Sequence, residues 1–149
     1  MRIRPLLPIA ALACLPIITV GCGSGESATP IAAVTTTKPA SAAGPDLSKA
    51  TFVDETGKAE VAVTVRDNVF VAPYTEVSAG TKVTFTNAGQ QPHNVTPVDA
   101  DEFTAIPTKD MQPKDSGTVT FDEPGDYSYY CTLHGTPSKG MIGTVRVLK

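Results

Sequence analysis

The stretch Tyr129-Tyr-Cys-Thr-Leu-His-Gly-Thr-Pro-Ser-Lys-Gly-Met141 decides how this chain folds, because it contains the end of a strand and a sharp return. Side chains alternate along an extended chain, so Tyr127, Tyr129 and Cys131 share one face, which we expect to point into the core. Glycine and proline residues then let the chain double back. We expect His134 to lie beyond the strand end in a loop, and Met141 to return just before the last strand begins at the next residue.

The chain offers few side chains that bind metals. It has two histidines, His93 and His134, and of its three cysteines only Cys131 lies beyond residue 22. A thiolate, two imidazoles and a weak axial thioether suit copper in electron-transfer sites. We therefore expect His93, Cys131, His134 and Met141 to bind one copper ion, with His93 at the opening of another strand. Small exported domains normally pair their cysteines, and metal ligation would explain the single thiol.

The N-terminus has the pattern of an export signal. Arg2 and Arg4 precede an apolar run that is too short to span a membrane, which needs about 20 apolar residues. Gly21 and Cys22 resemble a bacterial lipobox, in which the cysteine is lipid-modified and becomes the mature N-terminus. A simple cleaved signal peptide is the alternative. We expect Cys22 to anchor an extracytoplasmic protein to the outer face of the bacterial cytoplasmic membrane or to the cell envelope.

Composition divides the chain into three parts. Residues 1–22 form the expected lipoprotein signal peptide, which ends at the acylated cysteine. Residues 23–50 are mostly Gly, Ser, Ala, Thr and Pro, which predicts a flexible linker. Residues 51–149 have the usual length of one packed domain, and we expect this part to bind the copper.

Short segments of this domain alternate apolar and polar residues, which is the pattern of half-buried strands. They are residues 61–65, 83–85, 119–121, 126–131 and 145–147. Turn-forming residues separate them, as in Ala79-Gly80 and Pro124-Gly125. No segment has the period of a long helix, and residues 99–114 are expected to be irregular. The sequence therefore predicts an all-β domain, a single β-sandwich.

Other kinds of site fit these residues less well. A structural zinc site takes four strong nitrogen or sulfur donors, and this domain has three. A catalytic pair of Cys131 and His134 is another possibility, but an oxyanion motif is not evident and the cysteine would end a buried strand. A structural or adhesive sandwich without metal remains a third class. Asn94-Val95-Thr96 is a glycosylation sequon, which we interpret as fortuitous in a chain with a bacterial lipobox.

The domain resembles the blue copper proteins of the plastocyanin and azurin group, the cupredoxins. The segments that carry the resemblance are Phe70-Val71-Ala72-Pro73, Val77-Ser78-Ala79-Gly80, Val83-Thr84-Phe85-Thr86-Asn87, His93-Asn94-Val95 and Tyr127 to Met141. The resemblance implies a Greek-key β-sandwich with one type 1 copper, bound by His93, Cys131 and His134, with Met141 as axial ligand. It also implies that the backbone amide of Asn94 tunes the cysteine sulfur and that Tyr130 lies exposed beside the ligand strand.

The ligand loop departs from the pattern of the group. Six residues separate His134 from Met141, whereas plastocyanins typically have four. The axial position is therefore the least secure of the four, and Met111 is the other candidate. We keep Met141, because it follows Gly140 and directly precedes the final strand, as in the family.

The expected site favours electron transfer. Protein ligands fill all ordinary positions of the copper, so no position is open to a substrate, and two histidines cannot build additional copper centres. We therefore expect a single-electron carrier that cycles between Cu(II) and Cu(I), and no enzyme. The alternative is an extracytoplasmic copper carrier or buffer with the same ligands. By resemblance, electrons would pass through the edge of His134, across an apolar patch that includes Leu133 and Pro137.

Charge adds limited information about partners. Without Arg2 and Arg4 the chain keeps 10 of its 12 basic residues against 15 acidic ones, a formal charge of −5, which argues against a nucleic-acid partner. Acidic side chains could steer a basic redox protein toward the domain. These residues are Asp99, Asp101, Glu102, Asp122, Glu123 and Asp126. We expect redox proteins of the cell envelope as electron donor and acceptor, a membrane attachment through the lipid anchor, and a monomeric chain.

Overall fold

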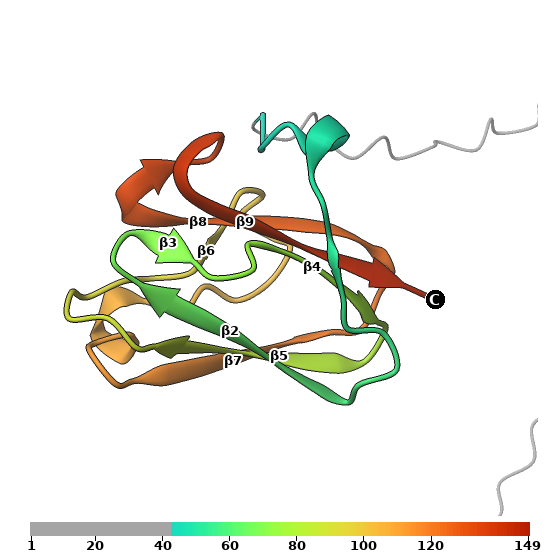
Figure 1. Ribbon diagram of the computed structural model, residues 1–149, viewed down its shortest axis with the longest axis horizontal. Coiled ribbons are helices and arrows are strands. Elements are labelled where there is room, and N and C mark those ends of the chain that lie inside the picture. Colours follow the sequence, from blue (N-terminus) through green and yellow to red (C-terminus); the bar gives the residue numbers. More distant parts are fainter. Residues whose placement is uncertain (1–42) are drawn as a thin grey trace, which may run out of the picture. The chain divides into compact units, whose positions relative to one another are not determined.

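The computed structural model describes residues 43–149, which form two β-sheets packed face to face (Figure 1). The five-stranded sheet has the order β1-β4-β9-β8-β6, and the four-stranded sheet has the order β3-β2-β5-β7. The strands are β1 (Val53–Asp54), β2 (Glu60–Arg66), β3 (Val69–Phe70), β4 (Tyr74–Ser78), β5 (Thr81–Asn87), β6 (Thr96–Pro97), β7 (Ser116–Phe121), β8 (Gly125–Thr136) and β9 (Lys139–Leu148). The helical elements of the described residues are two short 3-10 turns, η1 (Leu47–Lys49) and η2 (Thr108–Asp110). The predicted all-β sandwich is confirmed.

Alternating side chains explain how the two layers pack. Strands β2 and β5 bury every second residue, and they run parallel with Val63 opposite Phe85. Parallel neighbours need a crossover connection. Here the chain leaves β2, passes through β3, crosses to β4 in the other sheet and returns to β5.

The core between the sheets is apolar and rich in aromatic rings. Tyr129 lies edge-on against Phe70 and Phe85, with ring centroids 4.9 and 5.1 Å apart. Burying each large apolar side chain contributes about 1.5–3 kcal/mol. Tyr127 packs against this core, and Tyr129 and Cys131 are fully buried within it. The predicted inward face of β8 is therefore confirmed.

Residues 43–52, which we call the strap, cross the outer face of the five-stranded sheet. A Cβ on Gly44 would lie 3.7 Å from the Ser128 side chain on β8. At the other end, the Phe52 ring lies 4.0 Å from the Arg146 guanidinium and 5.7 Å from the Tyr74 ring. The strap overlaps the end of the segment predicted to be a linker. The rest of that segment lies outside the described residues, as do the predicted signal peptide and Cys22.

Three local expectations were wrong. Strand β8 runs to Thr136, so His134 lies within the strand and not beyond its end. Strand β9 begins at Lys139 and not at the residue after Met141. The physical reason is a hairpin that pairs residues 135 with 140 and 136 with 139, which extends both strands past the ligands. His93 lies in irregular chain two residues before an isolated bridge at Val95, and not at the opening of a strand.

Residues 99–114 behave largely as expected. They form irregular chain between β6 and β7, interrupted by η2 and by the bridge of Ile106 to Val95. Among residues 43–149, no helix is long and apolar enough to cross a membrane.

Candidate metal centre

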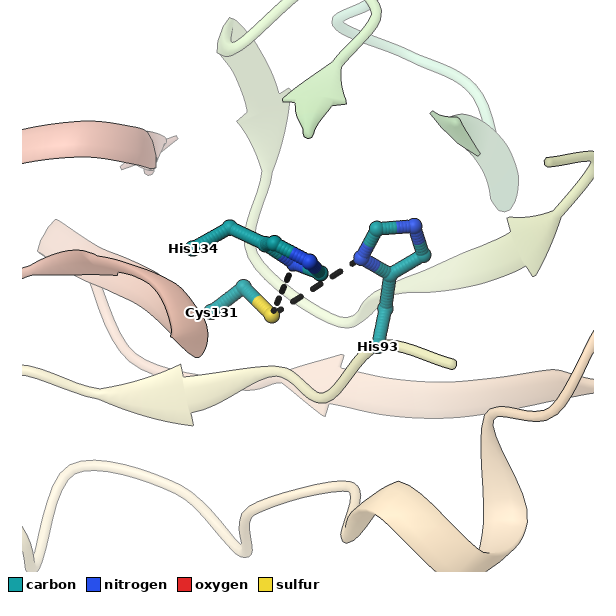
Figure 2. Close-up of side chains that lie close together, drawn as sticks. All are labelled: His93, Cys131 and His134. Atoms are coloured by element: carbon teal, nitrogen blue, oxygen red, sulfur yellow. Dashed lines mark hydrogen bonds between the residues drawn. The ribbon is translucent and has the colours of Figure 1, made fainter. Parts of the chain in front are cut away.

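Three predicted ligands converge at one end of the sandwich. The Cys131 Sγ atom lies 3.5 Å from Nδ1 of His134 and 3.8 Å from Nδ1 of His93 (Figure 2). The candidate ligand atoms of these three residues all lie within 4.8 Å of one another. For metal–nitrogen and metal–sulfur bonds of about 2.0 and 2.3 Å, ligands at tetrahedral to trigonal angles are about 3.5 to 3.8 Å apart. One metal ion therefore fits between the sulfur and the two nitrogens.

A bulge in the β8–β9 hairpin brings Cys131 and His134 together. Tyr130 pairs with Ile142 and Gly135 pairs with Gly140, so the four residues from Cys131 to His134 face Met141 alone. Such an excess of residues bends a strand and re-aims its side chains. The bulge therefore turns the thiol and the imidazole, three residues apart, toward a common point.

The same pairing places Met141 directly across the hairpin from the ligand bulge. Its side chain is 1 % exposed, and that of Met111 is fully buried. The Met111 carbonyl accepts a hydrogen bond of 3.1 Å from the backbone N–H of His93, so Met111 is also joined to the ligand region. The axial role of Met141 therefore stays a prediction, with Met111 as its alternative.

Two glycines allow the hairpin to close behind the ligands. Gly140 has a φ of +84°, and a Cβ there would lie 2.6 Å from the His134 carbonyl oxygen. A Cβ on Gly135 would lie 2.8 Å from the backbone nitrogen of Met141. Both contacts are too close for any other residue, so these glycines keep the backbones of His134 and Met141 side by side.

The electrostatics of the site suit a metal. His93 is fully buried, and its Nε2 atom has no hydrogen-bond partner. Burial lowers the pKa of His93, and the neighbouring His134 lowers it further, whereas Asp67 acts in the opposite direction. A neutral imidazole is the form that binds metals. A buried thiol that meets two imidazoles is a soft ligand set of the kind that copper prefers.

The side chain of Asn94 ties the two ligand segments together. The backbone N–H of Thr132 donates to its Oδ1 over 2.9 Å, and its Nδ2 donates to the hydroxyls of Thr132 at 2.7 Å and Thr108 at 3.2 Å. These bonds link the residue after His93 with the residue after Cys131. They also occupy the sequon nitrogen, and Asn94 is only 7 % exposed, in agreement with a fortuitous sequon. The expected contact of the Asn94 amide with sulfur stays a prediction.

The surface beside the site is partly apolar. His134 is half-buried, whereas Leu133, between Cys131 and His134, is 50 % exposed. Tyr130 is half-buried and not exposed as the resemblance implied. Pro137 is half-buried at the tip of the hairpin. Leu133 and Pro137 thus both present some apolar surface near His134 in the chain, and the role of this patch in electron transfer stays a prediction.

Sequence reasoning missed three polar residues around the ligands. Thr108 and Thr132 form hydrogen bonds with the Asn94 side chain, and Asn87 forms them with Gly89 and Gln91 of the loop that precedes His93. The sequence pattern could not mark Thr108 as part of the site, because this residue lies in irregular chain. It could have marked Asn87, which is a polar residue at a position that continues the buried face of a strand.

A β-sandwich that gathers one cysteine and two histidines at one end defines a class, the copper proteins with a trigonal sulfur and nitrogen site. The sequence profile of the family described as copper binding proteins, plastocyanin/azurin family, matches residues 58–148. The chain therefore belongs to the plastocyanin/azurin family of copper-binding proteins, and copper is the metal that its histidine and cysteine group could bind.

Individual relatives agree with the family. The chain is 39 % identical over 88 residues to plastocyanin of Solanum crispum, covering 52 % of this chain and 86 % of that protein. It is 38 % identical over 88 residues to plastocyanin B'/B'' of Nicotiana tabacum, with the same coverage.

Solved structures show the same fold. The Cu(I) form of a mutant amicyanin superposes with a TM-score of 0.52 at 29 % identity, over 60 % of this chain and 83 % of that chain. A second mutant of amicyanin, in its reduced form, gives 0.51 at 30 % identity, over 63 % of this chain and 87 % of that chain. The expected cupredoxin sandwich is confirmed.

Proposed function

We propose that this protein is a single-electron carrier, in which one type 1 copper bound by His93, Cys131 and His134 cycles between Cu(II) and Cu(I). The observation that carries the proposal is the convergence of one sulfur and two nitrogens within 4.8 Å at a largely buried point. When bound, copper supplies the one-electron chemistry. The chain supplies ligands whose positions are set by a hairpin bulge and by buried hydrogen bonds.

The surroundings of the ligands favour electron transfer over catalysis. His93 and Cys131 are fully buried, and His134 is the half-buried member of the group. Met141 is buried and lies across the hairpin from the bulge. Because two of the three ligand side chains are fully buried and the third is half-buried, a substrate has little direct access to a metal held between them. We therefore propose that the protein is not an enzyme.

The exposed edge of the site indicates where a partner binds. Leu133 is 50 % exposed and precedes His134 in the chain. An apolar surface beside a half-buried imidazole allows a redox protein to approach closely without desolvating many charges. We propose that electron donors and acceptors of the cell envelope dock over Leu133, and that electrons pass through His134.

The proposed location rests on the N-terminal pattern alone. Gly21 and Cys22 follow a short apolar run, as in lipoprotein signals. We propose that acylated Cys22 anchors the protein at the outer face of the membrane or elsewhere in the envelope, and that the folded domain acts as a monomer. Mass spectrometry of the mature protein from a bacterial membrane fraction tests this, since a free thiol at Cys22 or an N-terminus at another residue contradicts it.

Competition with a chelator separates an electron carrier from a copper carrier. The protein is loaded with copper, cycled repeatedly between ascorbate and ferricyanide, and incubated with a strong Cu(I) chelator throughout. An electron carrier keeps its copper over many cycles and returns to the same absorption spectrum. Transfer of most of the copper to the chelator within the first reduced phase contradicts our proposal and supports a copper carrier or buffer.

A further inference from the structure

We propose that Asn87 is a positioning residue for His93, a role that rests on the proposed copper site. Asn87 is the last residue of β5, and it is fully buried although its side chain is polar. Its side chain makes no hydrogen bond to His93, Cys131 or His134. Its hydrogen bonds instead organise the loop of residues 88–92 and the segment against which His93 is held.

The carboxamide of Asn87 satisfies three backbone groups. Its Nδ2 donates to the Gln91 carbonyl at 2.8 Å and to the Met111 carbonyl at 2.9 Å. Its Oδ1 accepts from the Gly89 N–H at 3.0 Å. A carboxamide has two donor hydrogens and an acceptor oxygen, so these bonds use both donors and the acceptor in one plane. An aspartate has no donors, and an apolar residue of similar size leaves all three groups without their partner.

The Met111 carbonyl links Asn87 to the ligand. It accepts a second hydrogen bond, of 3.1 Å, from the backbone N–H of His93. The backbone of Asn87 is fixed as well, because its N–H donates to Asp115 and its carbonyl accepts from Lys114. The backbone of His93 is therefore tied to strand β5 through one shared acceptor, two residues away from the nearest β-bridge.

Packing of the loop reinforces this arrangement. A Cβ on Gly89 would lie 3.0 Å from the Cα of Arg66 and 3.2 Å from the nitrogen of Asp67. The loop thus rests directly on the turn between β2 and β3, and Asn87 holds it there from the inside. His93 has no hydrogen bond from its Nε2 atom to fix the ring. Besides its contact with the Cys131 sulfur and the surrounding packing, the ring is therefore positioned by the backbone that Asn87 holds.

Substitution of Asn87 tests the proposal, with Thr81 as a matched control. Thr81 lies at the other end of the same strand, is buried, and donates one side-chain hydrogen bond of 2.9 Å to the Lys58 carbonyl. The variants are Asn87→Ala, the milder Asn87→Ser in case the first does not fold, and Thr81→Val. Each is compared with the wild type for thermal unfolding, copper release and amide hydrogen exchange.

We expect Asn87→Ala to release copper to a chelator about tenfold faster, because a factor of ten corresponds to the loss of one hydrogen bond to a buried group. The paramagnetic resonance spectrum of its Cu(II) form should change. In the metal-free protein, the His93 amide should exchange faster than in the wild type. Thr81→Val should lower the unfolding temperature without changing any of these three properties.

The outcomes separate this inference from the proposed function. If Asn87→Ala or Asn87→Ser only lowers the unfolding temperature, as Thr81→Val does, the residue is structural and the inference is wrong. The amide exchange of His93 is measured without copper, so it tests the positioning role even when no metal is present. A wild-type protein that binds no copper overturns the proposed function alone.

Discussion

Buried polar side chains fix the backbone beside the candidate ligands, and two of the buried polar atoms lack a hydrogen-bond partner. Asn94 and Asn87 are buried and hydrogen-bonded through both ends of their carboxamides, and both fix backbone beside the ligands. Two other buried atoms, His93 Nε2 and the Tyr129 hydroxyl, have no partner. An unpaired buried polar group costs about 1–3 kcal/mol. A metal bound at Nδ1 of His93 would not supply this missing partner, so both Nε2 and the Tyr129 hydroxyl bear the cost.

Replacement of Met141 by leucine tests the axial ligand. The substitution removes a weak sulfur donor that stabilises Cu(II) and keeps the buried volume nearly constant. We expect Met141→Leu to retain copper and to raise the reduction potential by about 59 mV or more, which is a tenfold shift for one electron. Spectroelectrochemical titration measures it. Met111→Leu is the control, and a rise in that variant alone assigns the axial position to Met111.

Replacement of Tyr129 by phenylalanine tests the unpaired hydroxyl. Burial raises the pKa of this phenol far above its ordinary value, so the group is neutral but still without a partner. We expect Tyr129→Phe to increase the free energy of unfolding by about 1 kcal/mol. Tyr127→Phe should instead lower it, since the Tyr127 hydroxyl donates to the Glu123 carbonyl at 2.8 Å. Urea unfolding of both variants measures these changes. Equal changes in the free energy of unfolding would contradict the claim that only the Tyr129 hydroxyl lacks a partner.

At the scale of elements, the β8–β9 hairpin is the part that builds the site. It supplies Cys131, His134 and Met141 from two strands that pair on both sides of the bulge. The two residues by which this ligand loop exceeds a typical plastocyanin extend the hairpin, and its strands pair as far as Thr136 and Lys139. The extension leaves the bulge intact, which explains how a longer loop still brings Met141 opposite Cys131 and His134.

Gly140 tests how tightly this hairpin must close. We expect Gly140→Ala to lower the free energy of unfolding by about 1–3 kcal/mol, from backbone strain and from the clash with the His134 carbonyl. Copper absorption should shift at the same time. Gly80→Ala is the matched control, because Gly80 has a φ of +85° but nothing within 4 Å of its Cβ position. Equal spectra for the two variants would argue against a role of the hairpin in shaping the site.

Local pattern predicted strands such as β2, β5 and the inward face of β8, because alternation reports directly which side of a strand is buried. It could not predict the strap, since the contact of Phe52 with Arg146 joins residues far apart in the sequence. The candidate ligands could be identified from the sequence because His93 and His134 are its two histidines and Cys131 is one of three cysteines. The bulge and the Asn87 contacts were not, because they depend on pairing across strands.

For the whole molecule, protonation of His93 links the candidate metal site to the free energy of unfolding. The pKa of His93 is lowered in the folded protein, mainly by burial. The unfolded chain, with a histidine pKa of about 6.5, therefore binds a proton more readily than the folded metal-free chain. The contribution of neutral His93 to the free energy of unfolding is therefore complete above about pH 6.5, and it is lost as the pH falls below that value toward the lowered pKa of the folded chain.

We accordingly expect the metal-free protein to have a smaller free energy of unfolding at pH 5 than at pH 7.5. The difference is about 1.4 kcal/mol for each unit by which the pKa is lowered, up to about 2 kcal/mol, because pH 5 lies about 1.5 units below the histidine pKa of the unfolded chain. Chemical denaturation at the two pH values measures it, and His93→Phe should remove most of the dependence. Stability that is unchanged or greater at pH 5 would contradict a buried neutral His93.

The most direct test of the copper site is the visible absorption spectrum of the purified protein after loading with Cu(II), measured beside the Cys131→Ser variant. We predict an intense blue band from thiolate-to-copper charge transfer in the wild type. The variant should lose this band and most of its copper affinity. A colourless wild-type protein, or a Cys131→Ser variant with the same spectrum, would contradict a copper centre built on Cys131, His93 and His134.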